Sequence, residues 1–180
     1  MNYEEILSLP IDKTSFCVLD VETTGLSPQY NNIIELGIVR VKNLKIVEKY
    51  HSLINPGREI PAFITGFTGI SNDDVYDAPF FDSIADEVIE FIGDNVIAGH
   101  NLSFDKSFLK REFNYCGRSE PKNPNLCTLK VARRIFPLLK SKSLGAVSSF
   151  LKIDEVQLTV VATLMDGGNN EYMKGLGNVH

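Results

Sequence analysis

The sequence predicts a mixed α/β fold built around one central sheet. Apolar runs rich in β-forming residues occur early in the chain, whereas segments with helical spacing of apolar residues dominate its later part. A short apolar strand between two of the helical segments adds the alternation that is typical of helices packed on a sheet. The chain has 180 residues, of which 43% are hydrophobic and 23% charged. We therefore expect residues 1–180 to form a single compact domain.

Three strands are predicted in the first third of the chain. Gly25 and Pro28 end the segment that follows the first strand, and Asn55-Pro56-Gly57 forms a turn after the third. Their short connections favour a β-meander. The predicted strands are residues 15–21, 33–41 and 44–54.

Helices dominate the rest of the chain. Apolar residues recur at helical spacing from residue 82 to 92, and Asp82 or Ser83 could cap this helix. After Ile153 the pattern weakens, and Gly167-Gly168 breaks the last apolar segment, so we expect residues 154–180 to be an atypical, poorly ordered tail. The other predicted elements are a buried strand at 95–99 and helices at about 104–113, 128–136 and 143–151.

Charge is distributed unevenly along the chain. The net charge is −5, but residues 106–152 hold 11 basic and 2 acidic side chains, whereas residues 1–105 hold 6 basic and 17 acidic ones. A basic block in an acidic protein can be the footprint of a phosphate backbone, and its alternative interpretation is a solvated helix face. The candidates for phosphate contacts are Lys110, Arg111, Arg133 and Arg134.

Compartment and membrane association are indicated by what the sequence lacks. Its three cysteines are scattered without a C-x-x-C pair, which suits thiols in a reducing compartment. No apolar run approaches the roughly 18 residues that span a membrane. The first residues also lack the pattern of a signal peptide. We therefore expect a cytoplasmic protein with no membrane partner.

Two carboxylates at the end of the first predicted strand are candidate metal ligands. Asp20 and Glu22 are two residues apart, so both side chains lie on one face of that strand. Like charges on one face repel each other unless a cation neutralises them, and oxygen ligands of this kind suit Mg²⁺ or Mn²⁺. Two exposed acids are the simpler alternative, but apolar flanks make burial without a metal costly.

A second polar motif follows the predicted strand at 95–99. Asp105 falls near the start of the next helix, where an acid is also favoured as an N-cap or first-turn residue. His100 could be a metal ligand, although an ordinary hydrogen-bonded histidine at a strand end is the commoner case. Taken alone, neither residue identifies a site.

Together these motifs resemble a known family. Val18-Leu19-Asp20-Val21-Glu22-Thr23-Thr24-Gly25-Leu26 is similar to the first motif of the DEDD, or DnaQ-like, exonuclease superfamily, and Gly99-His100-Asn101 through Phe104-Asp105 is similar to the second. Thr65-Gly66-Phe67-Thr68-Gly69-Ile70-Ser71 resembles the segment between them. The resemblance covers roughly residues 15–153 and is closest to the histidine branch, which includes proofreading domains of DNA polymerases.

The resemblance implies a ribonuclease H-like fold and hydrolysis of nucleic-acid 3′ ends with two divalent ions, Mg²⁺ or Mn²⁺. Asp20, Glu22 and Asp105 would be the metal ligands, with Asp20 shared by both ions. The implied partners are a single-stranded 3′ end, with DNA favoured over RNA, and a DNA polymerase subunit such as one of DNA polymerase III. The residues implied to lie near the terminal nucleotide are Thr23, Thr24, Leu26, Asn101 and Phe104, of which Phe104 could equally belong to the core.

The family's third motif is not matched. It is a histidine, the general base, followed five positions later by an aspartate. No histidine or tyrosine occurs between Phe150 and Asp166. Asp166 lies at a distance that suits the fourth catalytic carboxylate, but Val161 stands five positions before it and cannot accept a proton.

Three explanations remain open for this mismatch. The domain could be a catalytically weak relative, its carboxyl-terminal part could be altered, or a distant residue such as His180 could replace the base. The alternative function is a non-catalytic module of the same fold that binds nucleic-acid ends or a polymerase subunit.

Overall fold

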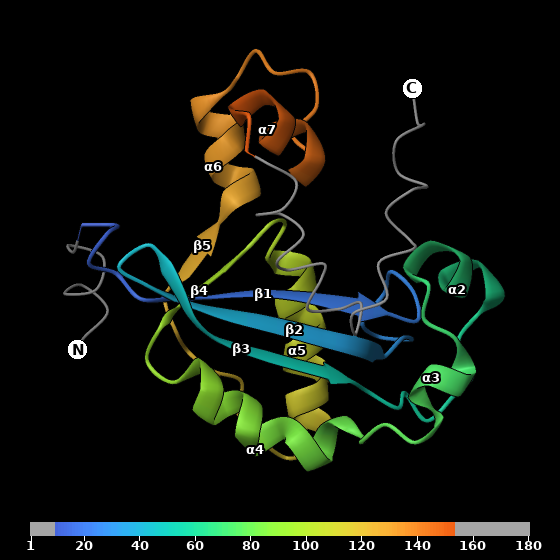
Figure 1. The fold of residues 1–180 in the computed structure, drawn as a ribbon. Helices are drawn as coiled ribbons and strands as arrows, with labels where there is room; N and C mark the ends of the chain where they lie inside the picture. Colours follow the sequence, from blue (N-terminus) through green and yellow to red (C-terminus); the bar gives the residue numbers. More distant parts are fainter. Residues whose placement is uncertain (1–9, 154–180) are drawn as a thin grey trace.

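The computed structural model describes residues 10–153, which form one mixed sheet with helices around it (Figure 1). The five strands lie in the order β3-β2-β1-β4-β5. The first three pair antiparallel, and β4 and β5 continue the sheet parallel to β1. Their bounds are β1 Phe16–Thr23, β2 Ile33–Lys42, β3 Lys45–Leu53, β4 Val96–Gly99 and β5 Asn125–Cys127.

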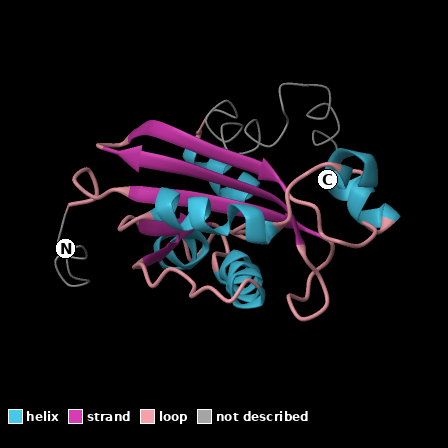
Figure 2. Cartoon of the chain, turned by 90° about the horizontal axis from the view of Figure 1, so that it is seen from below, coloured by secondary structure: helices cyan, strands magenta, loops and turns pink. Residues whose placement is uncertain are grey.

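The helices lie on both sides of the sheet and beyond its end (Figures 1 and 2). Helices α4 and α5 cover one face, whereas α6 and α7 stand on the other side, near the edge formed by β4 and β5. The short helices α2 and α3 lie beyond the carboxyl end of β1. Their bounds are α2 Ala62–Thr68, α3 Asn72–Tyr76, α4 Phe81–Ile92, α5 Ser103–Tyr115, α6 Thr128–Ile135 and α7 Leu144–Leu151.

The main core lies between the sheet and helices α4 and α5. Along β1 buried and partly exposed residues alternate, so Cys17, Leu19 and Val21 face these helices. Phe81 of α4 packs edge-on against Phe113 of α5 with ring centroids 5.1 Å apart. Asp20 and Glu22 consequently lie on the opposite face of the sheet, which leaves them available for chemistry.

The predicted mixed α/β class is confirmed, and each of the eight predicted strands and helices is found to within about two residues. Sequence analysis missed α2, α3 and β5, which have 7, 5 and 3 residues. Elements this short contain at most two helical turns or one strand repeat, so periodicity cannot reveal them. The predicted tail at 154–180 lies outside the described residues. No helix in residues 10–153 is long and apolar enough to cross a membrane.

Candidate active site

Asp20 and Glu22 lie at the carboxyl end of the central strand β1, side by side on the face away from the main core. Both side chains are partly exposed, whereas their neighbours Leu19 and Val21 are buried. Glu22 stands directly opposite Glu35 of β2 in the antiparallel register. The predicted placement of the two carboxylates on one strand face is confirmed.

Asp105 joins this pair from the start of α5. Its side chain is 3% exposed, and its Oδ1 accepts a hydrogen bond from the backbone N–H of Val21 at 3.2 Å. The N-cap of α5 is Leu102, which has no side-chain capping bond, so the N-cap interpretation of Asp105 is wrong. Asp105 is a first-turn acid that is turned toward β1.

Gly99 allows the strand that precedes Asp105 to approach β1 closely. A Cβ atom at this position would lie 3.0 Å from the carbonyl oxygen of Leu19 and 3.1 Å from Leu102 Cδ1. A side chain at this position would therefore require Leu19 or Leu102 to shift by a few tenths of an ångström. The glycine of the second motif thus allows close packing of β4 against β1.

The electrostatics of the three carboxyl groups link them to one another. Burial raises the pKa of Glu22 to about 7, and the negative charges of Asp20, Glu35 and Asp105 add to the increase. Burial also raises the pKa of Asp105 to about 7, with Asp20 contributing. Burial raises the pKa of Asp20 as well, and nearby His100 offsets part of that increase. Repulsion between carboxylates therefore makes Glu22 and Asp105 harder to ionise, and a bound cation would reverse this effect.

The donor set suits a hard divalent cation, but the residues are not arranged as a finished metal site. Within residues 10–153, no three His, Cys, Asp or Glu side chains already stand in a metal-holding group. Without a cation, the negative charges of neighbouring carboxylates repel one another. An ion would have to draw Asp20, Glu22 and Asp105 together.

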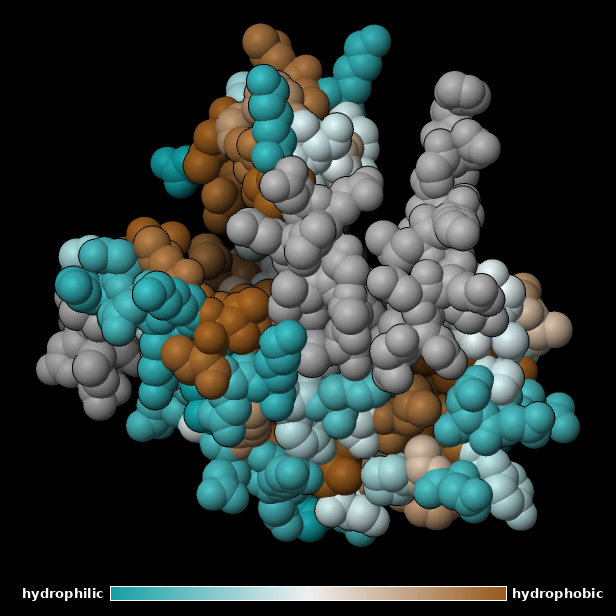
Figure 3. Space-filling model, viewed as in Figure 1, coloured by the Kyte–Doolittle hydropathy of each residue, from teal (hydrophilic) through white to brown (hydrophobic). Residues whose placement is uncertain are grey.

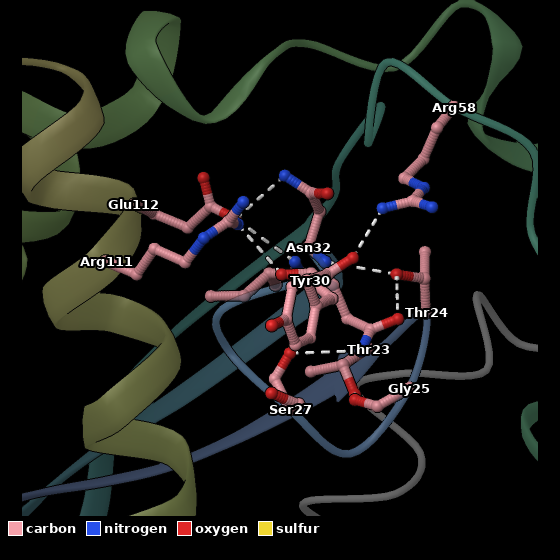
Figure 4. A network of polar contacts seen from close by, with 11 residues as sticks. Thr23, Thr24, Gly25, Ser27, Tyr30, Asn32, Arg58, Arg111 and Glu112 are labelled. Carbon is pink, nitrogen blue, oxygen red and sulfur yellow. Dashed lines mark hydrogen bonds and ion pairs between the residues drawn. The ribbon is translucent and has the colours of Figure 1, made fainter.

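The turn that follows Glu22 is closed by its own side chains (Figure 4). Thr23 donates to the carbonyl oxygen of Gly25 at 2.8 Å, and Thr24 accepts from the backbone N–H of Asn32 at 3.0 Å. Both threonines are buried, and Thr24 is only 2% exposed. A Cβ on Gly25 would lie 2.6 Å from the Asn31 side chain. The threonine hydroxyls therefore shape the turn rather than project from it.

Helix α5 holds the far end of the same turn (Figure 4). Glu112 is buried, and its Oε1 accepts hydrogen bonds from the backbone N–H of Ile33 at 3.3 Å and from Asn32 Nδ2 at 3.4 Å. Arg111 donates to the carbonyl oxygen of Asn31 at 2.8 Å. Sequence analysis missed Glu112, because nothing in the helix pattern separates an acid that binds a distant backbone from one in water.

The remaining residues predicted to lie near the terminal nucleotide have different surroundings. Leu26 is 86% exposed at the tip of the turn and is free to meet a ligand. Asn101 is exposed and has a left-handed backbone with φ of 65°. Phe104 packs against the main core, with its ring centroid 4.9 Å from that of Phe108. Leu26 and Asn101 are thus available at the surface, whereas Phe104 supports the core.

His100 is fully occupied by structural hydrogen bonds. Its Nδ1 lies 3.0 Å from Thr128 Oγ1, and its Nε2 lies 2.8 Å from the carbonyl oxygen of Lys142. These contacts connect the end of β4 to the start of α6 and to the loop before α7. The ordinary hydrogen-bonded interpretation of His100 is therefore the one that the structure supports.

A glutamate–histidine pair lies beside the acidic cluster and was not predicted. His51 Nε2 of β3 is 2.7 Å from Oε1 of Glu35, which is 2% exposed. Alternation along the strands places both on the face that carries Asp20 and Glu22. The sequence contained one indication of this pair: Glu35 lies inside the apolar run 33–41, where a buried carboxylate needs a polar partner.

The residues assigned to the third motif cannot be placed. Asp166, Val161 and His180 lie outside the described residues. Within residues 10–153, the histidines are His51 and His100, and both have hydrogen-bond partners.

The basic candidates differ in their availability. Lys110 pairs with Glu120 at 3.5 Å, and Arg111 stacks on Tyr115 in addition to its bond with Asn31. Arg133 and Arg134 are exposed on α6 and have no ion-pair partner among residues 10–153. The arginines of α6 are therefore the freer cations.

Comparison with known proteins assigns this arrangement to a class, the exonucleases. The chain belongs to the RNase T exonuclease family, whose model matches residues 17–158. It is also 29% identical to exonuclease X in complex with 5′ overhanging duplex DNA, with a TM-score of 0.62 over 77% of this chain and 74% of that one. A product-bound exonuclease I gives a TM-score of 0.72 at 16% identity, over 84% of this chain and 41% of that one. The fold is therefore the ribonuclease H-like fold of these nucleases.

Several relatives are DNA polymerase III proteins. The chain is 37% identical over 134 residues to DNA polymerase III subunit epsilon of Aquifex aeolicus, which covers 74% of this chain and 66% of that protein. It is 38% identical over 148 residues to DNA polymerase III PolC-type of Halalkalibacterium halodurans, covering 82% of this chain and 10% of that protein. The chain thus spans about a tenth of the PolC-type relatives and two thirds of the epsilon subunit.

Proposed function

We propose that this domain is a metal-dependent 3′→5′ exonuclease acting on single-stranded DNA ends. The observation that carries the proposal is that Asp20 and Glu22 share one face of β1, while Asp105 of α5 accepts a hydrogen bond from the backbone between them. Burial raises the pKa of all three carboxyl groups, and repulsion from neighbouring carboxylates adds to the increase at Glu22 and Asp105. Membership of the exonuclease family supports the reaction class. The names of the polymerase III relatives favour DNA as the substrate.

Two divalent ions, Mg²⁺ or Mn²⁺, would fit this site. Its donors are hard oxygen atoms, and the repulsion among them is the kind that a cation relieves. When bound, such ions activate a water molecule and stabilise the leaving 3′-oxygen. Asp20, Glu22 and Asp105 would hold the ions, and Asp166 is our candidate for the fourth carboxylate.

The protein's own residues would position the strand. Leu26, exposed at the tip of a turn closed by Thr23 and Thr24, would pack against the terminal nucleotide. Asn101 is exposed, two residues after the end of β4 and four residues before Asp105. Arg133 on α6 would contact the phosphate backbone, since it is exposed and unpaired among residues 10–153. In this proposal Phe104 supports the site from the core.

A non-catalytic role in binding nucleic-acid ends or a polymerase subunit is the second candidate. One observation favours it: no histidine or tyrosine occurs between Phe150 and Asp166, and the two histidines of residues 10–153 are engaged. Loss of a general base typically costs about 10²–10⁴ in rate, so this domain would be slow if the position is empty.

Digestion of a 5′-labelled single strand tests both candidates. An active exonuclease gives a ladder that shortens from the 3′ end with Mg²⁺ or Mn²⁺ and stops with EDTA. The non-catalytic module binds the strand in a gel-shift assay but releases no nucleotide with either ion. A strand with a blocked 3′ end and a free 5′ end distinguishes the two polarities, because a 3′→5′ exonuclease should leave it intact.

A further inference from the structure

Helices α6 and α7 form an apolar surface that the described part of the chain leaves largely uncovered. We call this surface the α6–α7 groove, and define it by Ile135, Phe136, Leu138, Leu139, Ala146 and Phe150. Its volume is about 710 Å³. Figure 3 shows hydrophobic residues in brown over these helices, interrupted by projecting hydrophilic side chains in teal.

Within the described residues, α6 and α7 bury fewer side chains than α4, a helix of the main core. Ala132 is the buried residue of α6 and Ser148 that of α7, whereas α4 buries six residues. Leu138 is 95% exposed, Ile135 60% and Phe150 54%. Isolated helices of 8 residues are marginal in water and rely on packing. A contiguous apolar surface of this kind indicates an interaction site.

The charged side chains of the segment that forms the groove are all cations, and one of them, Lys140, lines the groove. Residues 128–152 contain six Lys or Arg and no Asp or Glu. On the helical wheel of α6, Lys130 and Arg134 lie together along one side of the exposed Val131 and Ile135, whereas Arg133 falls on the opposite face of the helix. A partner that covers the apolar residues therefore meets cations at the rim and should carry carboxylates there.

The lining chemistry favours a polypeptide over a nucleic acid. Single strands bind by stacking bases on open aromatic faces. Here Phe136 and Phe150 pack on each other with ring centroids 5.2 Å apart, and the other lining side chains are mainly aliphatic. A concave groove of this volume takes a few apolar side chains of one segment, which is the mode in which an amphipathic helix docks.

We propose that the α6–α7 groove is a docking site for an acidic, amphipathic segment of a partner protein. Two or three apolar side chains of that segment fill the groove, and its carboxylates lie against Lys130 and Arg134. The surface is separate from the carboxylate cluster on β1, so docking requires no nuclease activity.

Selection from a random dodecapeptide library displayed on phage, with the full chain immobilised, tests this proposal. We expect enriched peptides that combine apolar residues at helical spacing with an excess of Asp and Glu. A synthetic copy should bind at least about 10-fold more weakly to Leu138→Asp, which removes an anchor of more than about 1.4 kcal/mol. Arg134→Glu should also weaken binding of this peptide, and the loss should be larger at lower salt concentration. Val47→Asp and Lys49→Glu, on exposed β3 positions, serve as matched controls and should leave binding unchanged.

Several outcomes would overturn the proposal. The library could give no peptide that depends on Leu138, or the enriched peptides could lack acidic residues. Displacement of the peptide by oligodeoxythymidine would assign the surface to nucleic acid. Displacement by a synthetic peptide of residues 154–165 would assign it to this chain's own segment. None of these results depends on whether the domain cleaves DNA, so the nuclease proposal stands or fails separately.

Discussion

The backbone N–H of Val21 donates a hydrogen bond to Oδ1 of Asp105 at 3.2 Å, across 84 positions of sequence. Val21 lies between Asp20 and Glu22, so this bond fixes Asp105 to the very residue that separates the other two carboxylates. An unpaired ionised carboxylate that is 3% exposed would be costly, and the backbone donor offsets part of that cost. The hydrogen bond thus holds Asp105 against the part of β1 that carries Asp20 and Glu22.

Asp20→Asn should remove nuclease activity while leaving the fold intact. The substitution keeps the shape of the side chain but removes the charge that both ions would share, so we expect the rate of nucleotide release to fall by at least ~10². In EDTA the melting temperature should stay the same or rise, because one of the mutually repelling charges is gone. Asp94→Asn, on an exposed residue after α4, is the matched control. Undiminished release by the Asp20 variant would refute the metal-ligand assignment.

The metal-free protein should become less stable as the pH rises toward neutrality. The pKa values of Glu22 and Asp105 are raised from 4.5 and 3.8 to about 7 in the folded state. Their protonated forms therefore favour the fold, and this contribution is complete below their unfolded values and lost as the pH rises through about 7. We expect the melting temperature in EDTA to fall between pH 5 and pH 8.

The variant Asp105→Asn provides the control for that pH dependence. Its amide oxygen can still accept from the Val21 N–H, but it does not titrate, so the slope of melting temperature against pH should decrease. Saturating Mn²⁺ should reverse the slope, because the ion binds the deprotonated carboxylates. Equal slopes for the variant and the parent protein in EDTA would contradict the raised pKa of Asp105.

Glu112→Ala should destabilise the domain by about 1–3 kcal/mol, because the buried N–H of Ile33 and the Asn32 amide lose their acceptor. Glu112→Gln retains an acceptor oxygen and should recover much of this loss. Urea denaturation followed by circular dichroism measures both variants. A general surface effect would make the two substitutions equivalent, and Glu90→Ala, at an exposed position of α4, measures the size of such an effect.

Arg133→Glu should weaken binding of single-stranded DNA and reduce its salt dependence. Each phosphate contact that is lost lowers the slope of log K against log salt concentration by about 0.7 for a single strand. Fluorescence anisotropy with a labelled oligonucleotide between low and moderate salt measures both quantities. Lys45→Glu, on the exposed β3, makes the same charge change away from α6. If the two variants behave alike, Arg133 belongs to a solvated helix face.

Val161→His should raise the turnover rate by about 10²-fold if Asp166 is the fourth carboxylate and residue 161 occupies the place of the general base. The rise should disappear in the double variant with Asp20→Asn, because the base acts on a water held at the metal site. Val160→His is the matched control one position away. A rate unchanged by Val161→His would mean that this segment does not present residue 161 to the cluster.

The sequence by itself determined the class of fold and the three carboxylates. Alternating and helical apolar spacing marks long elements, because burial against one sheet imposes a period on each of them. The same alternation puts Asp20 and Glu22 on one strand face, as found. Apolar spacing did not predict the short elements α2, α3 and β5, because they contain too few residues to repeat a pattern.

Only the tertiary structure decided which polar residues are hydrogen-bonded within the fold. Thr24 and His100 lie within motifs that imply ligand contact, yet their polar atoms are used by backbone and side-chain partners inside the domain. Glu35 and Glu112 look like ordinary acids in sequence, yet both are buried against partners from other elements. A hydrogen bond forms between groups that folding brings together from distant positions, so neither composition nor spacing encodes it directly.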